Sequence, residues 1–331
     1  MDSRRRVIVA LGAGALFRSQ VSLSQKPAKV WRIGFLAHRH IEFLDSDYQY
    51  GPFRQGMREQ GYVDGKNLSI EWRSAEGNSA RLPGLAAELA KLKLDVIVAG
   101  GTPATRAAQK ATATIPIVMA GVADPIGSGF IESLARPGKN ITGATNINVE
   151  LGPKQMEILF GIVSNVSRVG VLINPSNQSH AAYFRGCQDG AKRLGIEVIL
   201  PAKAQTPQEL ESAFAALAQE KAEALIVARD GFLNQEVRRV AALALRFRLP
   251  AIGGLREYVE AGGLISYGPS IREQFRRAEY YVARILQGAK PPELPAEQPM
   301  NFDLAVNLKT ARALGVTVPP VVMVRATRVI D

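Results

Sequence analysis

Residues 32–38 read RIGFLAH, and residues 168–174 read RVGVLIN. Three further stretches follow each of these in the same order: FRQGMREQGY (53–62), DVIVAGG (95–101) and IPIVMAG (115–121) in the first half, and FRGCQDGAKRLG (184–195), ALIVARD (224–230) and LPAIGG (249–254) in the second. Each half has the order strand, helix, strand, helix, strand, helix, strand. A repeat of this kind predicts two α/β lobes with a cleft between them.

Alternating strands and helices predict a doubly wound parallel sheet in each lobe. The tail after the second copy does not repeat, so we expect it to cross back between the lobes as part of a multi-strand hinge. The predicted N-terminal lobe spans residues 30–145 plus about 267–292. The predicted C-terminal lobe spans residues 146–266 plus about 293–331.

Some local predictions are specific enough to check one by one. Thr206-Pro207-Gln208-Glu209 and Ser270-Ile271-Arg272-Glu273 are capping boxes that open helices. We also predict helices over 126–135 and 303–314, and strands over 263–267 and 321–330.

Composition sets broad limits. The 331 residues are 47% hydrophobic and 21% charged, which is typical of a globular protein with packed cores. The formal net charge is +11, but the basic residues are spread along amphipathic helices without a run of five, so we expect no nucleic-acid partner. Cys187 is the single cysteine, which rules out an intrachain disulfide and predicts a small buried side chain.

The N-terminus has the pattern of an export signal. Three arginines (Arg4 to Arg6) precede an apolar run over residues 7–17, and Ser22-Leu23-Ser24 supplies the small residues of a cleavage site. We therefore predict a signal peptide over residues 1–24, removed before Gln25, by either the general or the twin-arginine route. No cysteine lies near the cleavage point, so the mature chain is expected to be periplasmic, soluble and not lipid-anchored.

In an open parallel sheet a ligand binds beyond the carboxyl ends of the strands, so the loops there hold the candidate residues. In the first lobe these are His38 after strand one, the Gly101-Thr102 turn after strand three, and Asp124 after strand four. We expect Thr102 to cap the following helix, whose N-terminus would favour an anion such as a ligand carboxylate.

The equivalent loops of the second lobe carry different chemistry. Asn174 follows strand one, Asp230 follows strand three as an acceptor for an amine or amide, and Arg256 and Tyr258 follow strand four. Arg256 is either a fork for a carboxylate or half of a structural ion pair with Glu257. Thr145 and Tyr267 stand where the chain would cross between the lobes, and line either the hinge or the site.

No catalytic motif is present, and the three histidines lack the carboxylate and cysteine partners of a metal site. We therefore predict no metal, no cofactor and no enzymatic activity. Two alternatives stay open. One is a two-lobe enzyme of the isomerase type, with Asp124 and Asp230 as an acid–base pair. The other is the ligand-sensing domain of a regulator.

Four stretches resemble a known family: IPIVMAGVADPIGSGFIESLARPGKNITGATN (115–146), SRVGVLINPSN (167–177), LREYVEAGGLISYGPS (255–270) and NFDLAVNLKTARALGVTVPP (301–320). They are similar to the ABC-transporter substrate-binding proteins that include tryptophan-import binding proteins. The similarity covers nearly the whole chain from Trp31 onward.

The resemblance implies a type I periplasmic-binding fold, with two lobes joined by three crossovers. It also implies a monomer that takes a small polar ligand, an amino acid or related carboxylate, into the cleft and closes to present it to a membrane permease. The residues that it implies for ligand binding are Gly101, Thr102, Asp124, Thr145, Asn174, Asp230 and Tyr258. The residues 38–40 depart from the small residues that members often carry there.

Overall fold

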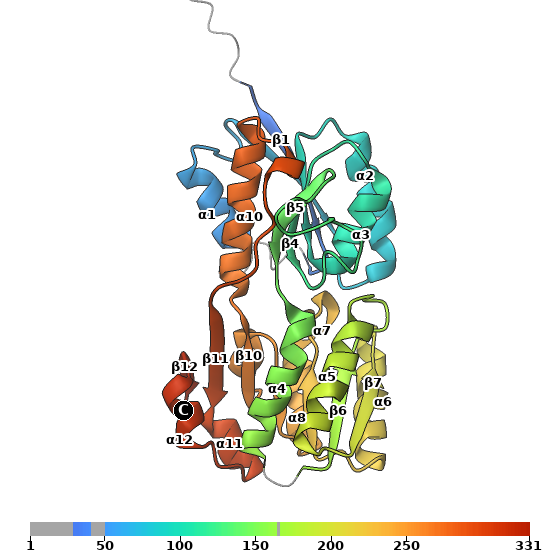
Figure 1. Cartoon of the computed structure of the whole chain (residues 1–331), viewed down its shortest axis with the longest axis vertical. Helices are drawn as coiled ribbons and strands as arrows, with labels where there is room; N and C mark the ends of the chain where they lie inside the picture. Colours follow the sequence, from blue (N-terminus) through green and yellow to red (C-terminus); the bar gives the residue numbers. More distant parts are fainter. Residues whose placement is uncertain (1–28, 41–49, 164–165) are drawn as a thin grey trace, which may run out of the picture.

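The computed structural model describes residues 29–40, 50–163 and 166–331, so the predicted signal peptide lies outside the described residues. Two α/β lobes lie one above the other, and hinge segments run along one side (Figure 1). No helix in the described part of the chain has the length and apolar character needed to cross a membrane.

The N-terminal lobe is built on a five-stranded parallel sheet of order β2-β1-β3-β4-β5. Its strands are β1 (Trp31–Ala37), β2 (Leu68–Ser74), β3 (Val96–Gly100), β4 (Ile117–Val122) and β5 (Ile141–Thr145). Helices α1 (Tyr50–Glu59) and α10 (Ile271–Leu286) pack on one face of the sheet, and α2 (Leu82–Lys91) and α3 (Gly101–Ala111) pack on the other. A short 3₁₀ helix, η2 (Ser79–Arg81), precedes α2.

The C-terminal lobe has a seven-stranded sheet of order β12-β11-β10-β9-β8-β6-β7, parallel except for the antiparallel pair β10–β11. The strands are β6 (Arg168–Ile173), β7 (Val198–Lys203), β8 (Ala224–Val227), β9 (Ala251–Gly253), β10 (Ile265–Pro269), β11 (Phe302–Asn307) and β12 (Arg328–Ile330). Its helices are α4 (Asn148–Ile162), α5 (His180–Leu194), α6 (Pro207–Gln219), α7 (Gly231–Gln235), α8 (Val237–Arg246), α9 (Arg256–Glu260), α11 (Leu308–Leu314) and α12 (Pro320–Arg325).

Within the described residues the chain crosses between the lobes at three places: after β5, between β10 and α10, and between the short helix η3 (Pro291–Glu293) and β11. Residues 267–269, which we placed in the N-terminal lobe, belong to the C-terminal sheet as the end of β10. Glu297, placed in the C-terminal lobe, bonds β5 instead, because its N–H donates to Gly143 O (3.0 Å) and its carbonyl accepts from Thr145 N (2.8 Å).

Local predictions are confirmed where residues close together in the chain determine the structure. Thr206 N donates to the Glu209 carboxylate at 3.3 Å as α6 begins, and Ser270 Oγ accepts from Glu273 N at 3.5 Å as α10 begins. Both helices therefore begin at the predicted capping boxes. Cys187 is buried, as expected.

Other local predictions are wrong, for reasons visible in the structure. Residues 126–135 form turns instead of a helix, and Gly129 there has φ +68°. Residues 303–307 extend β11, and a helix begins only at Leu308, after Asn307 Oδ1 accepts from Thr310 N at 2.9 Å. The predicted strand over 321–330 is divided between α12 and β12.

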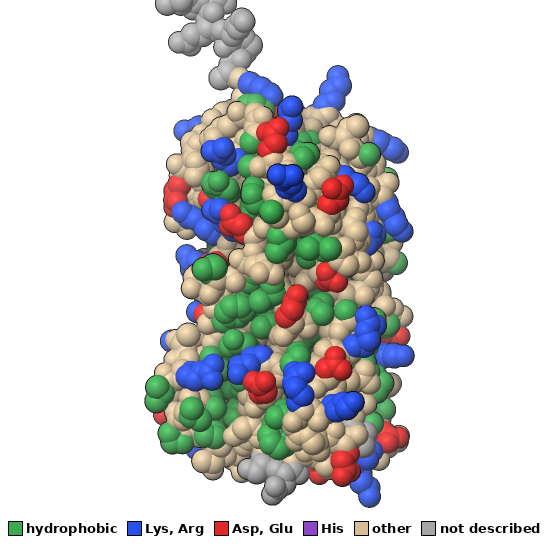
Figure 2. Space-filling model, viewed as in Figure 1, with side chains coloured by type: hydrophobic (Ala, Val, Ile, Leu, Met, Phe, Trp, Pro, Cys, Tyr) green, Lys and Arg blue, Asp and Glu red, His purple; other side chains and the backbone are tan. Residues whose placement is uncertain are grey.

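Charged side chains cover both lobes without a continuous basic surface on the face shown in Figure 2, where acidic and basic groups are interspersed. Arg276 with Glu59 and Arg246 with Glu211 are ion pairs on the lobe exteriors. Such exposed pairs each contribute at most about 1 kcal/mol to stability.

Gly143 on β5 lies close against the backbone of β4. Gly143 has φ +134°, and a Cβ there would lie 2.2 Å from Met119 O. We expect Gly143→Ala to lower the free energy of unfolding by about 3 kcal/mol or more, because backbone cannot move aside as a flexible side chain can. Urea unfolding followed by circular dichroism measures the change.

Gly84→Ala in α2 is the matched control, because no atom lies within 4 Å of its added Cβ. It should be neutral or stabilise by up to about 1 kcal/mol. A Gly143→Ala protein within about 0.5 kcal/mol of wild type, the range of ordinary surface substitutions, would show that β4 and β5 are not this close.

Candidate functional site

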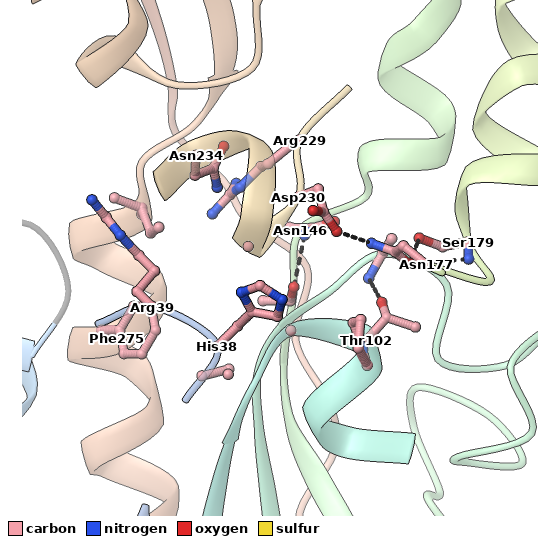
Figure 3. Close-up of a pocket in the computed structure, with 18 of the residues that line it drawn as sticks. His38, Arg39, Thr102, Asn146, Asn177, Ser179, Arg229, Asp230, Asn234 and Phe275 are labelled. Atoms are coloured by element: carbon pink, nitrogen blue, oxygen red, sulfur yellow. Dashed lines mark hydrogen bonds between the residues drawn. The ribbon is translucent and has the colours of Figure 1, made fainter. Parts of the chain in front are cut away.

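A cavity lies between the two lobes, at the carboxyl ends of their parallel strands. Both lobes line it, and its lining residues are His38, Arg39, Tyr50, Gly100, Gly101, Thr102, Pro103, Ala120, Gly121, Ala123, Asn146, Asn177, Ser179, Arg229, Asp230, Gly231, Asn234, Ile271 and Phe275. The polar members from the two lobes face one another across it (Figure 3). Its volume is about 70 Å³.

On the N-terminal side, the β3–α3 turn brings backbone to the cavity. Gly101 has φ +82°, a conformation that favours glycine, and it begins the eleven-residue helix α3. Thr102 does not cap this helix as predicted. Its hydroxyl accepts from Ala123 N at 3.3 Å and so connects the turn to the end of β4.

On the C-terminal side, Asp230 is the most fully bonded group. Its Oδ1 accepts from Asn174 Nδ2 (2.9 Å) and Phe232 N (2.8 Å), and its Oδ2 accepts from Asn177 Nδ2 (2.9 Å). Burial alone would raise its pKa, but His180, His38 and the two asparagine amides together lower it. Asp230 is therefore ionised at neutral pH, with its carboxylate held in one orientation.

His180 supports this network through contacts at both of its ring nitrogens. Its Nδ1 accepts from Asn174 N at 2.8 Å, and its Nε2 lies 3.2 Å from Arg229 O, which fixes the neutral tautomer with the proton on Nε2. Burial lowers the pKa of His180, more than Asp230 raises it. The loop that carries Asn174 and Asn177 is thus anchored to the loop that carries Asp230.

Arg229, the residue before Asp230 in the chain, contributes a buried cation to the cavity lining. Its Nη2 donates to Gln274 Oε1 at 2.7 Å, and its Nη1 donates to Pro269 O at 3.4 Å. Burial lowers the pKa of Arg229 to about 10, with Glu257 acting in the opposite direction, so the guanidinium stays charged at neutral pH.

An aromatic wall forms the remaining side of the cavity. Tyr50 and Phe275 line it, with ring centroids 5.5 Å apart in an edge-to-face arrangement. Phe35 lies behind them, 5.0 Å from Tyr50 and 6.2 Å from Phe275, and Trp72 contacts Tyr50 at 5.4 Å. This wall provides an apolar surface opposite the polar groups of the C-terminal lobe.

The lobes touch around the cavity, so the cleft is closed. Polar contacts between described residues of the two lobes include Arg39 Nη1 with Glu257 Oε1 (3.2 Å), Arg229 Nη2 with Gln274 Oε1 (2.7 Å), Arg106 Nε with Gln178 Oε1 (3.2 Å), and His40 N with Gln235 Oε1 (3.2 Å). The Arg39 and Glu257 side chains are only 7% and 12% exposed, so this ion pair is more shielded from water than those on the exterior.

The structure brings four of the predicted site residues to the cavity wall, namely His38, Gly101, Thr102 and Asp230. Asn174 lies just behind it and holds Asp230. Asp124 does not line this cavity, and its Oδ1 accepts from Gly127 N at 2.8 Å within its own turn.

The remaining predicted site residues lie away from the cavity wall. Thr145 is buried at the first crossing, and Tyr267 on β10 stacks on Phe302 with centroids 5.8 Å apart. Tyr258 packs in the core of the C-terminal lobe. Arg256 pairs with Glu260 at 3.1 Å instead of with Glu257.

Several lining residues were not among the predicted site residues: Arg39, Tyr50, Asn146, Asn177, Ser179, Arg229, Asn234 and Phe275. Arg39, Asn177 and Arg229 lie in loops that were predicted to hold the site. Their position directly after a strand was therefore the sequence feature that could have identified them as lining residues. Phe275 comes from a helix that the chain reaches only after its second crossing, and nothing local marks it.

No group of three or more histidine, cysteine, aspartate or glutamate side chains in residues 29–40, 50–163 and 166–331 is arranged to hold a metal ion. The described residues supply the cavity with one carboxylate, two guanidinium groups, amides and hydroxyls, a helix N-terminus and an aromatic wall.

Comparison with known proteins agrees with this geometry. The chain is 26% identical over 275 residues to a tyrosine-binding protein of Clostridioides difficile, covering 83% of this chain and 78% of the relative. The structure of an ABC domain from Streptococcus pneumonia in complex with L-Trp aligns with a TM-score of 0.83 at 25% identity, over 91% of this chain and all of the other.

A conserved domain protein from Vibrio cholerae aligns with a TM-score of 0.84 at 29% identity, with the same coverage of 91% and 100%. Its fold confirms the predicted pair of parallel-sheet lobes of the type I periplasmic-binding class. The family model for ABC transporter substrate binding proteins matches residues 40–330. The chain thus belongs to the family of ABC transporter substrate-binding proteins.

Proposed function

We propose that this chain binds an aromatic amino acid in the interlobe cavity and delivers it, outside the cytoplasm, to an ABC importer. The observation that carries the ligand class is Asp230, an ionised and fully oriented carboxylate on the cavity wall. The negative charge of this carboxylate favours a cationic group beside it in the cavity, and the α-ammonium group of an amino acid supplies one.

Two features of the cavity attract the carboxylate group of such a ligand. Arg229 lies beside Asp230 on the cavity wall, and the N-terminus of α3 opens there with its backbone N–H groups. A cationic and an anionic group that line the same cavity match the two charged ends of a zwitterion.

The charges of the described residues around the cavity also balance. Arg39 and Arg229 line the cavity with Asp230, and Glu257 pairs with Arg39, so the two cations face two anions. A ligand with no net charge leaves this balance intact when the cleft closes, whereas a ligand with net charge buries an uncompensated one.

The aromatic wall supports the choice of side chain. Tyr50 and Phe275 offer edge and face to a ring lying between them and the polar groups. Relatives named for tyrosine binding and solved with L-Trp point to the same class. The cavity of about 70 Å³ has space for only a few water molecules, so the lobes must separate further to admit such a ligand.

The alternative of an isomerase at this cleft would use Asp124 and Asp230 together. Asp230 lines the cavity, but Asp124 is bonded within its own turn and does not. The described residues around the cavity therefore offer one carboxylate aimed at a ligand, which favours binding over two-group acid–base chemistry.

We expect L-tyrosine or L-tryptophan to raise the melting temperature of the purified protein, because a ligand that binds only the folded state stabilises it by mass action. Asp230→Asn keeps the shape of the side chain but removes the charge, and should weaken binding by about tenfold or more in isothermal titration calorimetry.

Asp189→Asn on the exposed surface of α5 makes the same chemical change away from the cavity and should leave affinity unchanged. If neither amino acid binds, the ligand class is wrong. If one binds equally well to the wild-type and Asp230→Asn proteins, the role assigned to Asp230 is wrong.

The export proposal has a separate test. We expect the protein recovered from the extracytoplasmic fraction of expressing cells to begin at Gln25, because the residues before it have the signal-peptide pattern. N-terminal sequencing gives the answer, and a Lys-Lys replacement of Arg4 and Arg5 would block only twin-arginine export. Full-length protein found only in the cytoplasm would contradict the proposal.

A further inference from the structure

The His38 ring is fixed to the N-terminal lobe along one edge. Its Nε2 lies 2.8 Å from Ser79 Oγ at the start of η2, and its carbonyl accepts from Gly77 N at 2.9 Å. The residue is only 6% exposed. These two bonds hold the ring to the N-terminal lobe in one orientation.

The opposite edge of the ring lies against the C-terminal lobe. A Cβ added to Gly231, the first residue of α7, would lie 2.7 Å from His38 Cγ and 3.1 Å from His38 Nδ1. Nδ1 is buried and has no hydrogen-bond partner among the described residues. In the view of Figure 3 the ring lies between Phe275 and Arg39 on one side and Asp230 and Asn177 on the other. In the closed cleft Nδ1 thus lies against Gly231, which has no side chain to bond it.

The charged groups around His38 come from both lobes. Asp230 faces it from the start of α7, and its carboxylate already accepts from Asn174, Asn177 and Phe232 N. His40 follows on the same loop and pairs with Glu76. The neighbouring guanidinium groups are engaged elsewhere, Arg39 with Glu257 and Arg229 with Gln274.

These groups act on the imidazole in opposite directions. Burial lowers the pKa of His38 most, Asp230 raises it, and His40 lowers it, so the pKa lies below the usual 6.5. Separating the lobes uncovers Nδ1 and returns the ring toward its ordinary behaviour. Because the closed form has the lower pKa, protons bind the open form preferentially, and closure weakens as the pH falls below 6.5.

We propose that the contact between His38 and Gly231 controls closure of the cleft, and that the lobes close fully only over an uncharged His38 ring. This control of closure does not depend on which ligand binds in the cleft. It makes the closed state depend on the absence of a side chain at position 231 and on the protonation state of position 38.

Lobe separation can be followed by energy transfer between dyes on Lys91→Cys and Gln219→Cys. Both positions are exposed, at the ends of α2 and α6 on the side away from β10 and β11 (Figure 1). The native Cys187 is buried and its thiol pKa is raised by burial, so it will not compete for the dye. No ligand is needed, so the result does not depend on the proposed function.

We expect the ratio of closed to open molecules to fall between pH 8 and pH 5, by about tenfold per pH unit at most below the ordinary histidine pKa. His38→Gln cannot take up a proton in this range and should show a flat profile. Circular dichroism at each pH separates opening from unfolding. A profile that persists in His38→Gln, or closure that strengthens at low pH, would overturn the role of His38.

The glycine is tested by a pair of substitutions at pH 8. Gly231→Ala should shift the population to the open form, because its methyl group would overlap the ring. Adding His38→Gly to Gly231→Ala removes both the ring and the His38 Cβ, which would lie 2.8 Å from the added methyl group, and should restore closure. Gly84→Ala alone should have no effect. If Gly231→Ala closes like wild type, or if the double variant stays as open as Gly231→Ala, the contact does not control closure.

Discussion

The buried carboxylate of Asp230 is the interaction on which the arrangement of the cleft depends. A charge removed from water is tolerated only when its oxygens are bonded, and here the amides of Asn174 and Asn177 and the backbone of α7 supply the donors. Those bonds connect the loop after β6 to the loop after β8. His180 then fixes the loop after β6 by accepting a hydrogen bond from Asn174 N. One anion thereby determines the position of two of the loops that line the cavity.

The two lobes repeat the same order of strands and helices, but they present different groups to the cleft. The β3–α3 turn presents backbone through Gly101, whose φ of +82° suits a residue without a side chain. The equivalent β8–α7 turn presents Arg229 and Asp230. A ligand between them meets backbone and an aromatic wall on one side and full charges on the other. Such a cleft orients a small molecule that is itself asymmetric, with a polar end and an apolar end.

The sequence predicted the parts of the molecule that depend on local or repeated patterns. Buried strands, both capping boxes and the position of Asp230 after its strand all follow from residues next to one another in the chain. Residues 126–135 failed because apolar spacing indicated a helix while glycines and prolines imposed turns. Residues 303–307 failed because pairing with β10 overrides their own preference for a helix. Phe275 and the pairing of Arg39 with Glu257 could not be predicted, since they join segments that only the hinge brings together.

The hydrophobic cores lie within the lobes, whereas the contacts between the lobes are mainly polar. This difference explains how such a cleft can close reversibly. The four large apolar clusters lie within single lobes, apart from Leu255, which packs on the N-terminal cluster near the second crossing. The contacts that join the rims of the cleft are polar, and net contributions of about 1 kcal/mol each are usual for such bonds. Opening therefore exposes little apolar surface and exchanges these bonds for bonds to water. The difference between open and closed is small enough for a single ligand, or a single proton on a buried ring, to decide it.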